Sequence, residues 1–343
     1  MKNEDVAIVG GGPAGAYCAF ELAKKGIYAT ILDPSHPREK ACGGGILPAV
    51  ISKFPFVEKF RSKGFTFSDF RIISCINTQV FSKNLGNGFC IRRQVFDESI
   101  VNLAIGEGAE LVKERVIDVK QKGSKWTIKT NRGLRSAHIL VGADGVNSIV
   151  RRRTVGPISN TNLALGFGYI ATSSLKEQAT IRFLSEIPSY IWLFPGREYF
   201  NIGVGAELKY GSMLKKLLSD FTRTYCPHVQ ITSSFAALLP SAKNPKFFSI
   251  SCNDQNWILI GDAAGHVNPV SGGGILYALW GAKLAAESIR ENDLRSYDGK
   301  WRNEYGKDLI KICKQKKDFY DPIKSTLSLI TGSANKTYYL PKV

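Results

Sequence analysis

The sequence predicts an α/β protein in which a discontinuous, Rossmann-like domain carries an inserted antiparallel-sheet domain. Three observations support this fold class. A glycine-rich turn joins a buried strand to a helix near the N-terminus, buried strands recur at residues 138–143 and 256–260, and residues 162–251 are rich in strand patterns. At roughly 150 residues per domain, the chain is long enough for two domains.

The chain opens with a predicted βαβ unit. Residues 5–10 are expected to form a buried parallel strand, and residues 14–25 a helix whose apolar side chains recur at helical spacing. Gly26 ends this helix, and residues 27–33 supply the second strand.

The following elements alternate between the two domains. A loop rich in Pro and Gly covers residues 34–48, and an aromatic, basic stretch with weak strand alternation continues to about residue 88. We expect a helix over 94–107, short strands and a hairpin over 109–137, one helix near 211–225 inside the strand-rich stretch, and long helices at about 272–291 and 295–318.

These elements suggest domain boundaries. The Rossmann-like domain is assigned to residues 1–52, 89–161 and 252–320, the inserted domain to 53–88 and 162–251, and a C-terminal tail to 321–343.

Composition narrows the class of protein. The chain has 46 Lys and Arg against 29 Asp and Glu, a net charge of +17, so anionic surfaces attract it. The same charge is also consistent with a generally basic surface that has no polyanionic partner. Seven cysteines without a C-x-x-C pair and four scattered histidines predict neither a disulfide framework nor a metal site. With no apolar run of membrane-spanning length and no apparent signal peptide, we expect a cytoplasmic protein.

The N-terminal turn has the spacing of a dinucleotide-binding site. Gly10, Gly12 and Gly15 form a G-x-G-x-x-G pattern with Pro13 and Ala14, and Asp33 ends the next predicted strand. The glycines permit a tight turn and close approach to a pyrophosphate at the helix N-terminus, and Asp33 can accept a ribose hydroxyl. A second match at residues 166–171 falls inside a strand pattern and is interpreted as chance.

Two later motifs resemble the second and third fingerprints of the flavoprotein group that includes para-hydroxybenzoate hydroxylase. They are Gly142-Ala143-Asp144-Gly145 with Arg151, and Gly261-Asp262-Ala263-Ala264-Gly265 followed by Gly272-Gly273-Gly274-Ile275. The resemblance implies FAD as the cofactor, a para-hydroxybenzoate hydroxylase-like fold, and a first domain that binds FAD beside a substrate domain. It implies FAD contacts from Arg93, Val116, Asp144, Asp262, Gly273, Gly274 and Ile275. Asp144 has an alternative interpretation as an aspartate that caps a turn or helix.

Two further motifs resemble the geranylgeranyl reductase family. Cys42-Gly43-Gly44 resembles its cysteine loop beside the flavin ring, and Tyr190-Ile191-Trp192-Leu193-Phe194-Pro195 resembles the motif that lines its prenyl cavity. The resemblance implies substrate contacts from Tyr190, Trp192, Phe194 and Pro195, with Cys42, Tyr190 and Trp192 as candidate catalytic residues. Ordinary strand alternation, and for Cys42 a small buried side chain, are the structural alternatives. Because the chain ends soon after the second long helix, the resemblance is to the short members of the family.

The resulting hypothesis is an FAD-dependent oxidoreductase that reduces C=C bonds of a polyprenyl chain on a lipid or lipid precursor, by hydride transfer from the reduced flavin. A flavin-dependent monooxygenase or halogenase is the first alternative, and a non-catalytic flavin-binding lipid carrier is the second. We expect a prenylated lipid substrate, NAD(P)H or a ferredoxin-like carrier as electron donor, possible peripheral contact with anionic membrane, and no nucleic acid partner.

Overall fold

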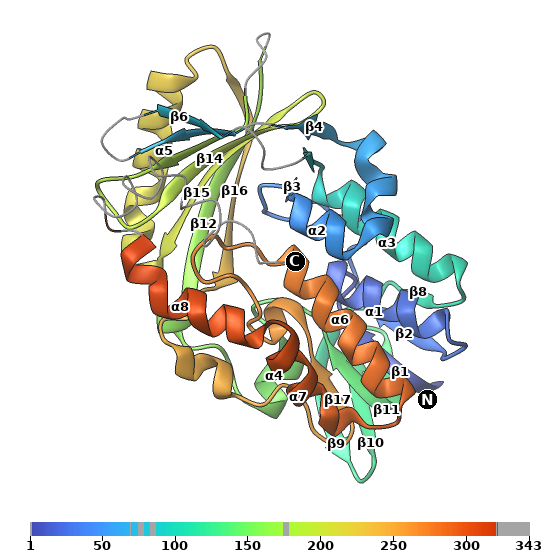
Figure 1. Ribbon diagram of the computed structural model, residues 1–343. Helices are drawn as coiled ribbons and strands as arrows, with labels where there is room; N and C mark the ends of the chain where they lie inside the picture. Colours follow the sequence, from blue (N-terminus) through green and yellow to red (C-terminus); the bar gives the residue numbers. More distant parts are fainter. Residues whose placement is uncertain are drawn as a thin grey trace.

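A computed structural model describes residues 2–68, 70–74, 79–82, 87–173, 178–319 and 321. The larger part of the predicted tail, from residue 322 onward, lies outside the described residues. Two seven-stranded sheets dominate the molecule, one at the lower right of Figure 1 and one at the upper left.

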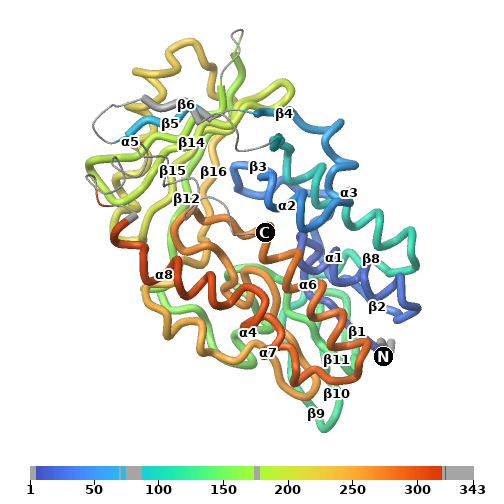
Figure 2. The backbone as a smooth tube through the Cα atoms, viewed as in Figure 1, coloured from blue at the N-terminus to red at the C-terminus, as the bar shows by residue number. Residues whose placement is uncertain are grey.

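The lower sheet contains the predicted βαβ unit. Its strand order is β8-β2-β1-β11-β10-β9, with β17 paired to β11. The strands span β1 Lys2–Val9, β2 Ala29–Leu32, β8 Glu110–Val112, β9 Val116–Lys122, β10 Lys125–Thr130, β11 Gly133–Gly142 and β17 Trp257–Leu259. β2, β1, β11 and β17 run parallel, so the strands predicted at 138–143 and 256–260 do join the N-terminal unit. Figure 2 shows blue, green and orange segments, far apart in sequence, side by side there.

Helices cover this sheet. α1 (Pro13–Ala23) starts directly after Gly12 with proline at its first position, where the missing N–H is harmless. It packs against α3 (Arg93–Gly106) and α6 (Ile275–Arg290), and α4 (Ile149–Thr154) packs on β9 and β11. The predicted helices at 14–25, 94–107 and 272–291 are therefore confirmed within a few residues.

The upper sheet has the order β16-β12-β15-β14-β13-β5-β6. Its strands span β5 Phe70–Ile73, β6 Gln79–Ser82, β12 Leu163–Thr172, β13 Thr180–Phe183, β14 Tyr190–Pro195, β15 Phe200–Glu207 and β16 Gln230–Pro240. Alternate side chains of β14 and β15 pack with Leu214, Leu218 and Phe221 of α5 (Gly211–Tyr225). This burial of one face leaves the other side chains of the same strands on the opposite face.

The stretch 48–63 differs from the predicted weak strand pattern. It folds as α2 (Pro48–Lys53) and the 3-10 helix η1 (Pro55–Lys63), each with a proline in its first turn. Phe56 stacks on Tyr17 and meets Phe60, four residues later, edge to face, so the aromatic residues follow a helical spacing. β3 (Gly45–Ile46), β7 (Gly88–Cys90) and β4 (Phe65–Phe67) form a small third sheet.

The C-terminal helical region is nearly continuous. α7 (Tyr297–Trp301), a π-helical turn (Arg302–Gly306) and α8 (Lys307–Phe319) follow one another, consistent with the helix expected at 295–318. Buried His266 lies against Trp301 and hydrogen-bonds Tyr305 at 3.0 Å. Burial, reinforced by the positive charges of Arg151 and Arg302, lowers the pKa of His266 to about 3. Within the described part of the chain, no helix combines the length and apolarity that crossing a membrane requires.

Candidate functional site

A cavity of about 920 Å³ takes its walls from both large sheets. Nearly all the predicted site residues line it, from both domains. They are Gly10, Gly12, Pro13, Ala14, Asp33, Cys42, Gly43, Gly44, Arg93, Val116, Asp144, Tyr190, Trp192, Phe194, Asp262, Gly273, Gly274 and Ile275. Gly15 and Pro195 are the two predicted residues outside its wall.

The three glycines of the N-terminal turn have different roles. Gly10 has φ +101°, and a Cβ there would lie 2.4 Å from the Ala143 carbonyl oxygen. A Cβ on Gly15 would lie 1.9 Å from the Gly10 carbonyl oxygen, so both residues are glycine because the backbone packs closely. A Cβ on Gly12 would meet no atom within 4 Å. Gly12 is therefore the position that leaves open space at the N-terminus of α1.

Asp33 organises the same turn. Its carboxylate accepts a hydrogen bond from the Gly11 N–H at 2.8 Å and another from the Ser35 N–H at 3.0 Å. Burial alone raises the pKa of Asp33, but the Arg38 guanidinium 3.3 Å away and these hydrogen bonds outweigh it, so the net pKa lies below its usual value. Asp33 is thus an ionised acceptor at the cavity wall.

The two aspartates of the later fingerprints differ in their partners. Asp144 accepts hydrogen bonds from Ser148 Oγ and from the Ile149 N–H at the start of α4. The structure therefore gives Asp144 the capping role that its alternative interpretation described, while it also lines the cavity. Asp262 follows β17 in the 3-10 turn Gly261–Ala263, and its carboxylate lies 3.5 Å from Lys40 Nζ.

Arg93 is held firmly in place. It pairs with Asp97 one turn later on α3 through two hydrogen bonds of 2.8 and 2.9 Å. Burial lowers the pKa of Arg93, but the Asp97 carboxylate outweighs burial and the net pKa is raised. The guanidinium is therefore a fixed positive charge beside Cys42, with which it also interacts.

The cysteine loop and the aromatic motif are in direct contact. A Cβ on Gly43 would lie 3.0 Å from the Phe194 ring and 3.1 Å from Trp192 Nε1. Asn201 on β15 joins the two motifs, since its side chain donates to the Cys42 carbonyl at 2.7 Å and accepts from Trp192 Nε1 at 2.8 Å. Because nothing in the sequence marks Asn201, only the strand register places it there.

The third fingerprint forms the start of α6. Gly274 is the residue before the helix, Ile275 is its first residue, and both line the cavity. Tyr190 donates a hydrogen bond to the Ser271 carbonyl just ahead of this helix. The N-termini of α1 and α6 thus both open into the cavity, where their N–H groups favour negative charge.

At the centre of one row of the upper sheet, two facing glycines leave the surface without side chains. Tyr190 lies opposite Gly205, which lies opposite Gly166, which lies opposite Ala237. A Cβ on Gly166 or Gly205 would meet its nearest neighbour only at 3.7 Å, and all four residues line the cavity. We call this row, Tyr190–Gly205–Gly166–Ala237, the bare row.

The adjacent row is filled. There a Cβ on Gly203 would lie 2.2 Å from the Trp192 ring, and one on Gly168 would lie 2.2 Å from the Phe235 ring. The two aromatic rings therefore lie across these glycines and form a ridge along the bare row.

Several cavity residues are not predicted by any motif. Arg38, Lys40, Asn201, Ser241 and Lys316 all reach the site or its supports through chain folding alone. Of these, Arg38 and Lys40 sit in the loop between Asp33 and Cys42, so proximity in sequence was the one available signal.

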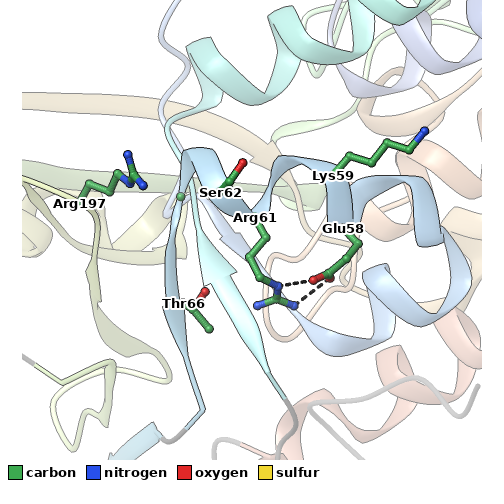
Figure 3. A pocket seen from close by; sticks show the side chains of 7 residues that line it. Glu58, Lys59, Arg61, Ser62, Thr66 and Arg197 are labelled. Carbon is green, nitrogen blue, oxygen red and sulfur yellow. Dashed lines mark hydrogen bonds and ion pairs between the residues drawn. The ribbon is translucent and has the colours of Figure 1, made fainter.

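A second hollow, of about 490 Å³, lies on the surface near η1 and β4 (Figure 3). None of the predicted site residues lines it. One of its cations, Arg61, donates to Glu58 and to the carbonyls of Asn87 and Gly88. The hollow is therefore a surface feature apart from the main cavity.

The main cavity fits FAD on structural grounds. Gly12 leaves room for a pyrophosphate at a helix N-terminus, ionised Asp33 can accept ribose hydroxyls, and a second helix N-terminus opens beside Asp262. The carboxyl ends of the parallel strands, where open α/β sheets bind ligands, form this wall.

Comparison with known proteins agrees with this fit. Residues 3–47 match the family model described as FAD binding domain. Digeranylgeranylglycerophospholipid reductase 3 of Methanosphaera stadtmanae is 30% identical over 322 residues, 85% of this chain and 80% of that protein. Menaquinone reductase of Mycolicibacterium smegmatis is 29% identical over 334 residues, 87% of this chain and 79% of that protein.

A solved structure extends the likeness to the whole fold. The geranylgeranyl bacteriochlorophyll reductase-like protein of Thermoplasma acidophilum superimposes with a TM-score of 0.85 at 20% identity, covering 98% of this chain and 97% of that one. The predicted α/β class and para-hydroxybenzoate hydroxylase-like fold are confirmed. With its FAD-binding segment and a relative at 30% identity over most of both chains, this protein is an FAD-dependent oxidoreductase that belongs to the geranylgeranyl reductase family.

Proposed function

We propose that the protein reduces C=C bonds of a polyprenyl chain carried by a lipid or lipid precursor. The observation that carries the proposal is the continuity of one cavity from the open glycine turn at Gly12 to the bare row beside Tyr190. Relatives named for reduction of digeranylgeranylglycerophospholipid and geranylgeranyl diphosphate support the same substrate class.

The nucleotide end of the cavity holds the cofactor in this proposal. Gly10, Gly12 and the α1 N-terminus receive the pyrophosphate, Asp33 a ribose, and Asp262 with Gly273 and Gly274 the part nearest the ring. Arg93, Val116 and Asp144 complete the wall, although Asp144 also caps α4. Reduced FAD supplies a hydride for the alkene when it is bound.

The sheet end of the cavity holds the substrate. The glycines of the bare row leave a channel for the prenyl chain in this proposal, and the Trp192 and Phe235 rings form a ridge beside it. A prenyl chain in this channel is held against apolar groups and away from water. An unactivated alkene is a poor hydride acceptor, so such positioning and exclusion of water must supply much of the rate.

The wall residues have distinct proposed roles. Trp192 and Phe194 pack against Gly43 and hold the cysteine loop at a fixed distance from the substrate channel. Burial raises the pKa of Tyr190, with Cys42 adding to the effect, so its hydroxyl keeps its proton. Cys42 and Tyr190 are the candidate groups for delivering the second hydrogen as a proton, and Pro195 acts by ending β14 behind the wall.

The electron donor and the domain division remain part of the proposal. NAD(P)H that docks transiently, or a ferredoxin-like carrier, is the expected donor. The second glycine match lies inside β12 and does not supply a nucleotide-binding turn for NAD(P)H. The boundaries at 1–52, 53–88, 89–161, 162–251 and 252–320 place β5 and β6 with the substrate sheet, as their pairing supports.

Anaerobic reoxidation of the reduced flavin tests the function. The FAD-loaded protein is photoreduced without oxygen, and a geranylgeranyl lipid or its fully saturated analogue is added. We expect the unsaturated lipid to restore the oxidised flavin spectrum and the saturated analogue to have no effect. A flavin that stays reduced with every prenyl lipid tried would favour a carrier, and reoxidation only with oxygen, coupled to substrate, would favour a monooxygenase or halogenase.

A further inference from the structure

The sheet end of the cavity is apolar except at one place. Among the described residues that β12–β16, their connections and α8 contribute to its wall, the charged ones are Glu207 and Lys316. Lys316 comes from α8, and its side chain is 13% exposed. Burial disfavours the charged form of a lysine, so favourable contacts have to offset the free-energy cost of burying Lys316.

The contacts of Lys316 do not fully neutralise its positive charge. Its Nζ donates to Ser241 Oγ at 2.8 Å and lies 3.7 Å from a Glu207 carboxylate oxygen. Glu207 also faces Lys209 Nζ at 3.3 Å, so the group of Lys316, Lys209 and Glu207 carries a net charge of +1. An ammonium has three N–H donors, and these two partners occupy at most two.

The position of this group along the sheet is defined by register. Trp192 lies opposite Gly203 and Tyr190 opposite Gly205, while Glu207 follows on the same face of β15. At about 3.3 Å per residue, Glu207 lies roughly 13 Å along the strand from Gly203. The charged group is therefore displaced from the aromatic end, where the cysteine loop and the cofactor wall meet.

We propose that Lys316, assisted by Ser241, binds a phosphate group at the polar end of the substrate. The inference rests on the proposed function and makes it more specific: the substrate is a prenyl phosphate or phospholipid rather than a neutral prenyl quinone or alcohol. Phosphate supplies several strong acceptors for the remaining ammonium N–H, and its charge balances the net charge of the group. Lys316 is a specificity-determining residue in this proposal and takes no part in hydride or proton transfer.

A purely structural role is the competing explanation. Lys316 could serve only to attach α8 to β15 and to the segment after β16 through Glu207 and Ser241. That role requires the same contacts but predicts no discrimination between ligands. The experiment therefore has to compare ligands that differ only in the head group.

Binding titrations on the FAD-loaded full chain supply this comparison. Perturbation of the flavin absorbance is followed on addition of geranylgeranyl monophosphate or geranylgeraniol, and inorganic phosphate is used as a competitor. We expect the wild type to bind the monophosphate at least about tenfold more tightly than the alcohol, since a hydrogen bond to a charged group exceeds a neutral one by that order. Inorganic phosphate should weaken monophosphate binding and leave alcohol binding unchanged.

Variants separate the charge from the fold. Lys316→Met should remove the preference for the monophosphate while retaining the affinity for FAD and for the alcohol. Lys316→Arg should keep the preference. Lys314→Met, which changes an exposed lysine nearby on α8, should bind both ligands as the wild type does. Equal wild-type affinity for phosphate and alcohol would overturn the inference and leave the proposed function standing. Binding of inorganic phosphate without any preference for the prenyl phosphate would overturn it in favour of a free-anion site. Failure of both prenyl ligands to bind would contradict the proposed function itself.

Discussion

Replacing Gly12 with valine should abolish FAD binding while leaving the fold intact. A Cβ at Gly12 meets no protein atom within 4 Å, and its backbone (φ −71°, ψ −176°) is extended, which a β-branched residue adopts readily. The added methyl groups therefore enter only the space that the pyrophosphate needs. Substitutions in such open positions usually change the free energy of unfolding by no more than about 0.5 kcal/mol.

The expected size of the effect follows from ligand linkage. At an FAD concentration one hundred times Kd, binding stabilises the wild type by about 2.7 kcal/mol. For domains of about 150–250 residues, 1 kcal/mol changes Tm by about 2–4 °C, so added FAD should raise the wild-type Tm by about 5–10 °C. The Gly12→Val protein should show no rise and should purify without the yellow colour of FAD.

Thermal denaturation of the apoprotein with and without FAD measures this directly. Gly106→Val at the end of α3, where a Cβ likewise meets nothing within 4 Å, is the matched control and should respond to FAD as the wild type does. Gly15→Ala, in contrast to Gly12→Val, should lower the Tm of the apoprotein, because the added Cβ would overlap the Gly10 carbonyl. Full FAD occupancy in Gly12→Val would refute the assignment of the N-terminal glycine turn as the pyrophosphate site.

Four other outcomes are expected. Trp192→Ala and Tyr190→Ala should reduce turnover of prenyl lipid far more than FAD affinity, as measured by steady-state rates beside flavin content; parallel loss of both would indicate plain core residues. Asn201→Ala should cost about 2 kcal/mol of unfolding free energy, because two hydrogen bonds at about 1 kcal/mol each are lost, and denaturant titration that shows no change would contradict the bridge between the two motifs. His266 stays neutral in the folded protein because its pKa is lowered from 6.5 to about 3. Its contribution to the free energy of unfolding is therefore fully present above pH 6.5 and falls by about 1.4 kcal/mol per pH unit as the pH drops towards 3. Denaturant titrations at several pH values should show this slope, and His266→Gln should flatten it. The exposed lysines of α8 are Lys307, Lys311, Lys314 and Lys317. We expect this side of the helix to bind anionic liposomes in flotation assays, with about 1 kcal/mol per basic residue near the surface and weaker binding at high salt. Binding that does not depend on lipid charge would exclude the electrostatic mechanism.

The FAD end of the site was largely predictable because its signals are local. The glycine spacing, the following helix and Asp33 all lie within one βαβ unit, where short-range backbone geometry determines the outcome. Residue types alone, however, do not separate Gly12, which faces open space, from Gly15, which packs on the Gly10 carbonyl. That distinction depends on backbone segments that pack together only in the folded chain.

The substrate end depends on long-range register. Gly166 and Gly205 come from strands about forty residues apart and meet only through the pairing of β12 with β15. Asn201 and Lys316 carry no motif. Lys316 reaches the cavity wall because of where α8 packs. Asn201 joins the cysteine loop to the aromatic motif because of where β15 pairs with β14. The helices at 48–63 escaped prediction because their aromatic residues were interpreted as part of a strand pattern, whereas prolines at both starts favour helix.

Mass spectrometry of the lipid after a complete reduction determines whether the protein reduces prenyl C=C bonds. Photoreduced, FAD-loaded protein is incubated without oxygen with a geranylgeranyl phospholipid, and the lipid is then extracted and its mass and double bonds are determined. We expect a product that has gained two hydrogens for each bond reduced, in amounts matching the flavin reoxidised, and that contains no added oxygen or halogen. An unchanged lipid beside a reoxidised flavin, or an oxygenated or halogenated product once oxygen and halide are admitted, would contradict it.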